Sequence, residues 1–185
     1  MIIGIFCGSS SGSDGIYLEA ARQTGRALAE QGIGIVYGGG RVGLMGAVAE
    51  SALSAGGRVV GVIPRALADA ELAHKGLTDL HVVGSMHERK AKMSDIADAF
   101  IALPGGPGTL EEIFEQWTWG QLWIHQKPCG LLNVNGYFDP LKAMIERMVV
   151  DGFMRRDHGD MLALSGDVGR ILDHFRAYVP PPRKW

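Results

Sequence analysis

Several features that mark particular protein classes are scarce or missing in this sequence. Only two cysteines, Cys7 and Cys129, occur in 185 residues. Two are too few for a disulfide framework, so we expect both to be small buried side chains. No apolar run approaches the roughly 20 residues of a membrane-spanning helix, and no basic leader precedes the apolar start at residues 2–6. The sequence therefore predicts a cytoplasmic protein without a membrane partner.

An excess of charge and the spacings of metal ligands are also lacking. The chain carries 18 Lys and Arg against 20 Asp and Glu, a net charge of −2, which gives no reason to expect a nucleic-acid partner. The six histidines form no HExxH pattern and the cysteines are far apart, so no metal site is expected. Glycine, in contrast, is abundant: 27 residues, about twice the usual share. Because no Gly-X-Y period accompanies them, these glycines need a local explanation.

Short runs rich in Ile and Val alternate with helical patterns, as is typical of a parallel sheet covered by helices. We predict strands at residues 2–7, 33–37, 58–63, 79–83, 99–103 and 128–134. Helices are predicted at about 13–32, 44–55, 86–95, 109–125, 140–150 and 166–178. The expected fold is α/β, a Rossmann-like three-layer arrangement with a parallel sheet flanked by helices on both faces. We predict one domain over residues 1–179 and a flexible tail over 180–185.

Three glycine-bearing turns, at residues 7–10, 38–40 and 105–109, follow predicted strands, where open parallel sheets bind ligands. The second matches G-x-G-x-x-G through Gly38, Gly40 and Gly43. A dinucleotide site also needs an acid about 20 residues further on, where this chain has Ile-Pro-Arg at 63–65. NAD binding is therefore disfavoured, although Arg65 leaves NADP open. The alternative is tight turns with close packing, for which glycine suffices.

The turn at residues 105–109 is the most informative of the three. A helix that begins near Thr109 presents free backbone N–H groups and a positive dipole end, which suit a phosphate. No Lys-Ser or Lys-Thr pair follows Gly108, so this is not a triphosphate-binding Walker A loop. A monophosphate fits better, and a plain strand–helix turn is the alternative.

Charged residues lie next to this turn in the sequence. Glu111 and Glu112 fall in the first turn of the predicted helix, with Glu115 on nearly the same face. They either complement the helix dipole or place one ionised carboxylate against a ligand. Arg89 and Lys90 sit near another helix start, where cations oppose the dipole. A ligand phosphate or the nearby carboxylates would offset them, and a solvated helix face is the alternative.

The helix at 109–125 also carries several large aromatic residues. Its core face is expected to be lined by Leu110, Ile113, Phe114 and Trp117. Trp119 and Trp123 lie off that face, which favours a helix buried on two sides at a dimer interface.

Four ordered motifs resemble one known family. They are Pro-Gly-Gly-Pro-Gly-Thr-Leu-Glu-Glu at 104–112, Tyr-Gly-Gly-Gly at 37–40 with Gly-Leu-Met-Gly at 43–46, Met-His-Glu-Arg-Lys at 86–90, and Thr-Trp-Gly-Gln-Leu at 118–122 with His125. Together they are similar to the PGGxGTxxE, MHxRK and TWxQLxxH signatures of the LONELY GUY (LOG) family. These are cytokinin riboside 5′-monophosphate phosphoribohydrolases, which have also been called lysine decarboxylases. The resemblance runs from Ile3 to about Val150.

The resemblance implies hydrolysis of the N-glycosidic bond of N6-substituted AMP, and of AMP itself, to give free base and ribose 5-phosphate. It also implies a nucleotide-binding domain with a Rossmann-like fold, no cofactor or metal, and a homodimer. The implied catalytic pair is Arg89 and Glu112. The implied substrate-binding residues are Gly39, Gly40, Glu71, Lys90, Gly105, Gly106, Gly108, Thr109, Glu111 and Thr118.

The resemblance leaves two questions open. Pro107 replaces a tyrosine often found at that position of the family and keeps the N–H donors of residues 106 and 108. Plausible linings of the base-side pocket are Met45, Met86, Met93 and Trp119, although such residues at helical spacing are more often core.

Two other functions compete with this one. One is a broader purine 5′-monophosphate nucleosidase in nucleotide salvage, and the other is a carrier that binds a nucleotide or the molybdenum cofactor without hydrolysis. Lysine decarboxylation would need a pyridoxal phosphate lysine. The candidate, Lys90, stands beside an arginine in what looks like an anion site, so we reject it.

Overall fold

The computed structural model describes residues 1–69 and 73–183. Its strands are β1 (Ile2–Phe6), β2 (Gly34–Tyr37), β3 (Val59–Pro64), β4 (Asp79–Val83), β5 (Ala99–Ala102), β6 (Cys129–Leu132) and β7 (Leu162–Ser165). Its helices are α1 (Gly15–Glu30), α2 (Gly43–Ser54), α3 (Arg65–Asp69), α4 (Met86–Ile96), α5 (Pro107–Gln121), α6 (Asp139–Val150), α7 (Arg156–Gly159) and α8 (Val168–Ala177), with a 3₁₀ turn at Val134–Gly136.

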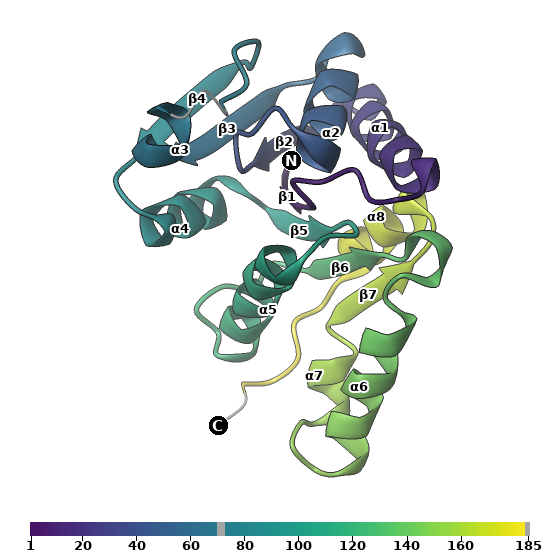
Figure 1. The fold of residues 1–185 in the computed structure, drawn as a ribbon. Coiled ribbons are helices and arrows are strands. Elements are labelled where there is room, and N and C mark those ends of the chain that lie inside the picture. Colours follow the sequence, from purple (N-terminus) through teal and green to yellow (C-terminus); the bar gives the residue numbers. More distant parts are fainter. Residues whose placement is uncertain (70–72, 184–185) are drawn as a thin grey trace.

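The strands form one parallel sheet. Its order over the described residues is β4-β3-β2-β1-β5-β6-β7, so β4 and β7 are the edges (Figure 1). The chain builds outward from β1 to β4 on one side and then returns to pair β5 with the other side of β1. The carboxyl ends of β1 and β5 therefore flank a topological switch point, where such sheets bind ligands.

Two apolar layers pack on the two faces of the sheet. Alternate side chains of each strand point to opposite faces, so Ile3 and Ile5 of β1 lie against α1, α2 and α8. Phe6 lies on the other face, in a cluster with residues of α4 and α5 such as Met93 and Trp117. This arrangement confirms the predicted three-layer α/β fold. Within the described residues, no helix is long and apolar enough to cross a membrane.

The predicted elements are all present, and the sequence missed three short ones, α3, α7 and β7. Strand β7 has only four residues, Leu-Ala-Leu-Ser, all partly buried at a sheet edge, so it lacks the Val or Ile that every predicted strand contains. Helix α5 begins at Pro107 and ends at Gln121, whereas the sequence predicted 109–125. Pro107 occupies the first helical turn, where its fixed φ is favourable. Trp123, with φ of 60°, ends the helix.

The residues after the last helix contact the rest of the domain. The indole Nε1 of Trp123 donates to the carbonyl of Pro181 at 3.0 Å, and Arg155 Nη1 donates to the carbonyl of Arg183 at 3.0 Å. The guanidinium of Arg183 also stacks over the Trp123 ring, 5.8 Å from its centroid. Residues 181–183 thus lie along the surface near the end of α5, where the sequence predicted a flexible tail.

Close packing of α1 on α2 gives a first testable prediction. A Cβ added to Gly25 of α1 would lie 2.3 Å from the carbonyl oxygen of Val48 in α2. We expect Gly25→Ala to lower the free energy of unfolding by about 1–3 kcal/mol, because the two helix backbones must separate. Gly15→Ala on the same helix is the control, since a Cβ there meets no described atom within 4 Å. Urea denaturation of both variants measures the difference, and equal stabilities would contradict the packing argument.

Candidate active site

A cleft of about 450 Å³ opens at the carboxyl edge of the sheet, beside the switch point between β1 and β5. The turns that follow β1 and β5 are held together there, because the N–H of Gly8 donates to the carbonyl of Pro104 at 3.1 Å. The cleft is lined by Cys7, Gly8, Ser9, Gly38, Gly40, Val42, Met45, Ile63, Leu67, Met86, Arg89, Gly106, Pro107, Gly108, Thr109, Glu111 and Glu112.

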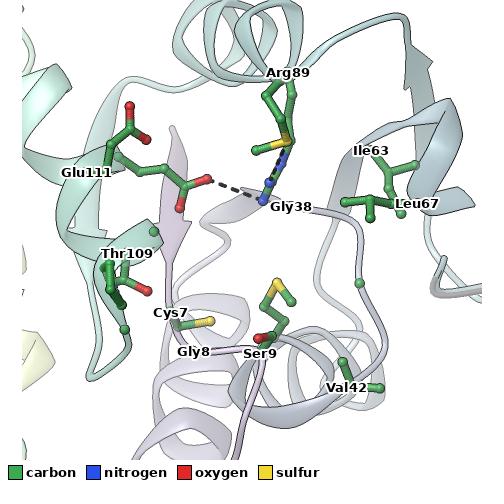
Figure 2. Close-up of a pocket in the computed structure, with 17 residues that line it drawn as sticks. Cys7, Gly8, Ser9, Gly38, Val42, Ile63, Leu67, Arg89, Thr109 and Glu111 are labelled. Atoms are coloured by element: carbon green, nitrogen blue, oxygen red, sulfur yellow. Dashed lines mark hydrogen bonds and ion pairs between the residues drawn. The ribbon is translucent and has the colours of Figure 1, made fainter.

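The cleft has two chemically different walls (Figure 2). The start of α5, which carries Thr109 and Glu111, forms one side. Opposite it lie apolar side chains, including Ile63 at the end of β3 and Leu67 of α3, with Val42 lower in the view. Such a space suits a ligand with an anionic end and an apolar end.

Arg89 and Glu112 form an ion pair inside this cleft. Arg89 Nη2 lies 3.3 Å from Glu112 Oε1, and only 12% and 10% of the two side chains is exposed. The arginine reaches this position across the backbone of Gly38, where a Cβ would lie 1.9 Å from Arg89 Nη2. Only glycine leaves room for the guanidinium here. The structure therefore brings together the two residues that the sequence assigned to catalysis.

The ionisation of Glu112 is governed by burial and by Arg89. Burial is the largest influence and raises the pKa of this carboxyl, while Arg89 opposes that rise. The sequence predicted that Glu111 and Glu112 fall in the first turn of this helix, and this placement is wrong. Because α5 already begins at Pro107, its first turn holds no acidic residue, and the dipole effect fades beyond that turn. Among the nearby charges, Arg89 favours the carboxylate most, and Lys90 acts in the same direction.

Lys90, one residue along α4, lies against two other carboxylates of α5. Its Nζ donates to Glu111 Oε1 and, at 3.0 Å, to Glu115 Oε1. Burial would lower the pKa of Lys90, but the hydrogen bonds to Glu111 and Glu115 outweigh it and hold the pKa above its usual value. The carboxylates of α5 thus offset the cations near the start of α4, one of the two partners expected from the sequence. Lys90 does not line the cleft.

The start of α5 forms the other polar part of the cleft. Gly106 caps the helix without a side-chain hydrogen bond, and Pro107 follows it. A Cβ at Gly106 or Gly108 would meet no described atom within 4 Å, so internal packing does not require glycine at either position. Their bare backbone faces the cleft, where it leaves space for a close ligand. Thr109 is buried beside them.

Of the remaining predicted binding residues that the structure describes, Gly40 lies in the cleft, whereas Gly39, Gly105 and Thr118 do not line it. The carbonyl of Gly39 accepts a hydrogen bond from the N–H of His74. The carbonyl of Gly105 accepts one from the hydroxyl of Tyr137 at 2.6 Å. Thr118 is exposed on α5 and does not line the cleft. Glu71 lies outside the described residues.

Sequence reasoning found part of the apolar wall. Met45 and Met86 line the cleft, but Met93 is buried between α4 and the sheet, and Trp119 lies elsewhere. Val42, Ile63 and Leu67 were missed. Only their positions in the chain could have indicated that they line the cleft. Val42 precedes α2, while Ile63 and Leu67 stand at or just after the end of β3. Such places are visible only once the strand order is known.

Two further observations concern other chemistry at the site. Cys7 lines the cleft, and burial raises the pKa of its thiol well above the usual range, so the thiol stays protonated. Among residues 1–69 and 73–183, no group of three or more His, Cys, Asp or Glu side chains is arranged to hold a metal ion.

Solved structures with this fold include molybdenum cofactor proteins. One is the molybdenum cofactor binding protein from Rippkaea orientalis, with 22% identity, a TM-score of 0.72 and 95% coverage of both chains. Another is the molybdenum cofactor carrier protein from Chlamydomonas reinhardtii, with 21% identity, a TM-score of 0.73 and coverage of 96% of this chain and 98% of that one. At these identities the likeness extends to the fold alone.

Sequence relatives are much closer. The family model described as "Possible lysine decarboxylase" matches residues 45–175. A cytokinin riboside 5′-monophosphate phosphoribohydrolase from Rhodococcoides fascians is 54% identical over 81% of this chain and 76% of its own. A probable enzyme of the same name from Oryza sativa subsp. japonica is 49% identical over 96% of this chain and 72% of its own. With the PGGxGTxxE and MHxRK residues meeting in one cleft, these matches show that the chain belongs to the LOG family of cytokinin riboside 5′-monophosphate phosphoribohydrolases.

Proposed function

We propose that this enzyme hydrolyses the N-glycosidic bond of N6-substituted adenosine 5′-monophosphates, and of AMP, to release the free base and ribose 5-phosphate. The observation that carries the proposal is the buried Arg89–Glu112 pair in the cleft, between the start of α5 and an apolar wall. The names of relatives up to 54% identical describe this reaction on cytokinin ribotides. The extension to AMP is our own.

The two walls of the cleft suggest how such a nucleotide lies. Its phosphate would bind at the start of α5, on the backbone of Gly106 and Gly108 and beside Thr109. Its base and the N6 substituent would face the apolar wall, which includes Ile63 and Leu67. The ribose then lies between them, near Glu112. Binding energy from the phosphate, remote from the reacting bond, is available to position the sugar.

Glu112 has the chemistry that the reaction needs. Breaking a ribosyl C–N bond builds positive charge on C1′ and the ring oxygen, as in glycoside hydrolysis. A carboxylate nearby stabilises that charge and orients the attacking water. The bond between C1′ and the base nitrogen breaks, the oxygen of water bonds to C1′, and a proton from water ends on the departing base. In this scheme Arg89 keeps the buried carboxylate ionised and in place.

Removing the charge of Glu112 tests its role. We expect Glu112→Gln to lower kcat by about 100-fold or more, because the side chain keeps its shape but loses the negative charge that stabilises the transition state. Base release from N6-isopentenyl-AMP measures it. Glu30→Gln, at an exposed position of α1, is the control and should retain wild-type kcat. A folded Glu112→Gln variant with full activity would remove Glu112 from the mechanism.

A panel of substrates tests the reaction and separates it from its rivals. We expect kcat/KM to be highest for N6-isopentenyl-AMP, lower for AMP and lowest for GMP. The nucleoside N6-isopentenyladenosine should react about 100-fold more slowly than its monophosphate, because it lacks the anchoring phosphate. Equal or faster turnover of AMP and GMP would favour nucleotide salvage. Binding without release of ribose 5-phosphate would mean a carrier.

We also propose that the enzyme is a homodimer that pairs through the side of α6. This helix has no fully buried residue in the single chain, although Met144, Val150 and, just beyond its end, Phe153 are apolar. Their exposed fractions are 53%, 68% and 83%. An exposed apolar group of this kind supports a protein–protein contact. Trp123, which the sequence assigned to a dimer interface, contacts the segment at 181–183 of its own chain.

Charges placed on this surface test the dimer. We expect the double variant Met144→Asp, Phe153→Asp to shift the mass in solution from twice that of the chain to once, because two carboxylates per chain would be buried unpaired. Light scattering after size-exclusion chromatography measures the mass. The matched control, Ile16→Asp and Val42→Asp at exposed positions of another face, should remain dimeric. A dimeric test variant would place the interface elsewhere.

We further propose a cytoplasmic location. Both cysteines, Cys7 and Cys129, are buried free thiols. Reduced cysteines are the usual state in the cytosol, so this chemistry supports the proposed compartment.

A further inference from the structure

A buried polar network joins α4 to α5 below the cleft. The hydroxyl of Ser94 on α4 donates to Gln116 Oε1 on α5 at 2.9 Å. Gln116 is only 1% exposed and Ser94 7%. Burying an amide and a hydroxyl among apolar side chains costs free energy unless they are paired. The hydrogen bond therefore favours one relative position of α4 and α5. Positions in which one helix is shifted along the other would leave these two side chains unpaired.

His125 completes this network from the segment after α5. The backbone N–H of Lys127 donates to His125 Nδ1 at 3.1 Å, so the imidazole proton is on Nε2, which lies 3.3 Å from Gln116 Oε1. Burial is the main influence on this imidazole and, with Lys127, lowers its pKa to about 4. The neutral ring is thus held as a donor to Gln116. Lys127 Nζ in turn donates to the carbonyl of Ser94 near the end of α4.

The network stands one helical turn from the charged residues that pair α4 with α5. Ser94 follows Lys90 by four residues on α4, and Gln116 follows Glu112 by four residues on α5, so each pair shares a helix face. Three polar contacts follow one another along the two helices. They are the Arg89–Glu112 ion pair, the ion pairs of Lys90 with Glu111 and Glu115, and the Ser94–Gln116 hydrogen bond. Of these contacts, the Ser94–Gln116 hydrogen bond joins two uncharged side chains, and neither of them lines the cleft.

We propose that Gln116 is a positioning residue: through Ser94 and His125 it fixes α4 against α5 in the register that brings Arg89 to Glu112. The inference rests on the proposed function, because the register matters for catalysis only if that pair acts on the substrate. Misplacing a catalytic group by about 1 Å can cost about 100-fold in rate. The network acts through the Arg89–Glu112 contact and touches no substrate.

The kinetic test uses Gln116→Met, which keeps a similar length but removes the acceptor. We expect kcat for N6-isopentenyl-AMP to fall at least tenfold while KM changes less than about twofold, since the phosphate site on α5 is untouched. Gln23→Met on α1, an exposed position, is the matched control with wild-type kcat. If Gln116→Met does not fold, Ser94→Ala removes the same hydrogen bond with a smaller change. Wild-type kcat in the folded variant would overturn the proposal.

A double variant separates positioning from simple stabilisation. Gln116→Met leaves the Ser94 hydroxyl and the His125 Nε2–H without their acceptor, and adding Ser94→Ala removes the unpaired hydroxyl, which should recover part of the lost stability. We expect kcat to stay low in the stable double variant, because the register is still unspecified. A kcat that returned together with stability would show that the network only stabilises the fold.

The titration of Glu112 gives a readout that does not depend on turnover. The charged groups that act on its carboxyl are Arg89, Lys90, Glu111 and Glu115, and Arg89 is the one that most lowers the pKa. If Gln116→Met moves Arg89 away, the pKa of Glu112 rises. Carbon-13 NMR of labelled glutamate, assigned with Glu112→Gln, should show this rise. An unchanged pKa of Glu112 in Gln116→Met would overturn the positioning inference, whatever the activity of the wild-type enzyme. A wild-type enzyme that hydrolysed no nucleotide would refute the proposed function.

Discussion

Ion pairs between two cations of α4 and three carboxylates of α5 hold the two helices together, and the site depends on these pairs. Arg89 with Glu112, and Lys90 with Glu111 and Glu115, join the two helices. Removing one partner of a buried pair leaves an uncompensated charge, which costs several kcal/mol. The same pairing sets the protonation of Glu112, since burial alone would drive its carboxyl toward the neutral form. The same ion pairs thus hold α4 against α5 and influence the protonation of Glu112.

The sheet explains how residues far apart in the sequence meet in this set. Arg89 comes shortly after β4 at one edge, while Glu112 follows β5, on the other side of β1. Both helices begin at the carboxyl edge and cover the same face, so their early turns meet beside the switch point. The cleft takes its polar wall from α5 and its apolar wall from the ends of β3 and the residues before α2.

Local patterns predicted much of this arrangement because they reflect local physics. Apolar runs that alternate with helical patterns predicted the three layers of the fold. The glycine turns after strands predicted which edge of the sheet forms the cleft, because open parallel sheets bind ligands there. Other features depend on contacts distant in sequence. The start of α5 at Pro107 changed the account of Glu112, and no pattern linked Ser94 to Gln116, which are 22 residues apart. The short edge strand β7, Leu-Ala-Leu-Ser, contains none of the Val and Ile by which the other strands were predicted.

Gly38 has a consequence for how this pocket can evolve or be redesigned. Arg89 lies where any Cβ at position 38 would be, so this part of the wall is bare backbone. A surface made of backbone offers no side chain to exchange, and even alanine would expel the guanidinium. The wall opposite α5 contains separate side chains such as Val42 and Leu67, both of them partly open to solvent. New substrate preferences can therefore arise through exchanges among those side chains, while the bare backbone beside the Arg89–Glu112 pair offers none.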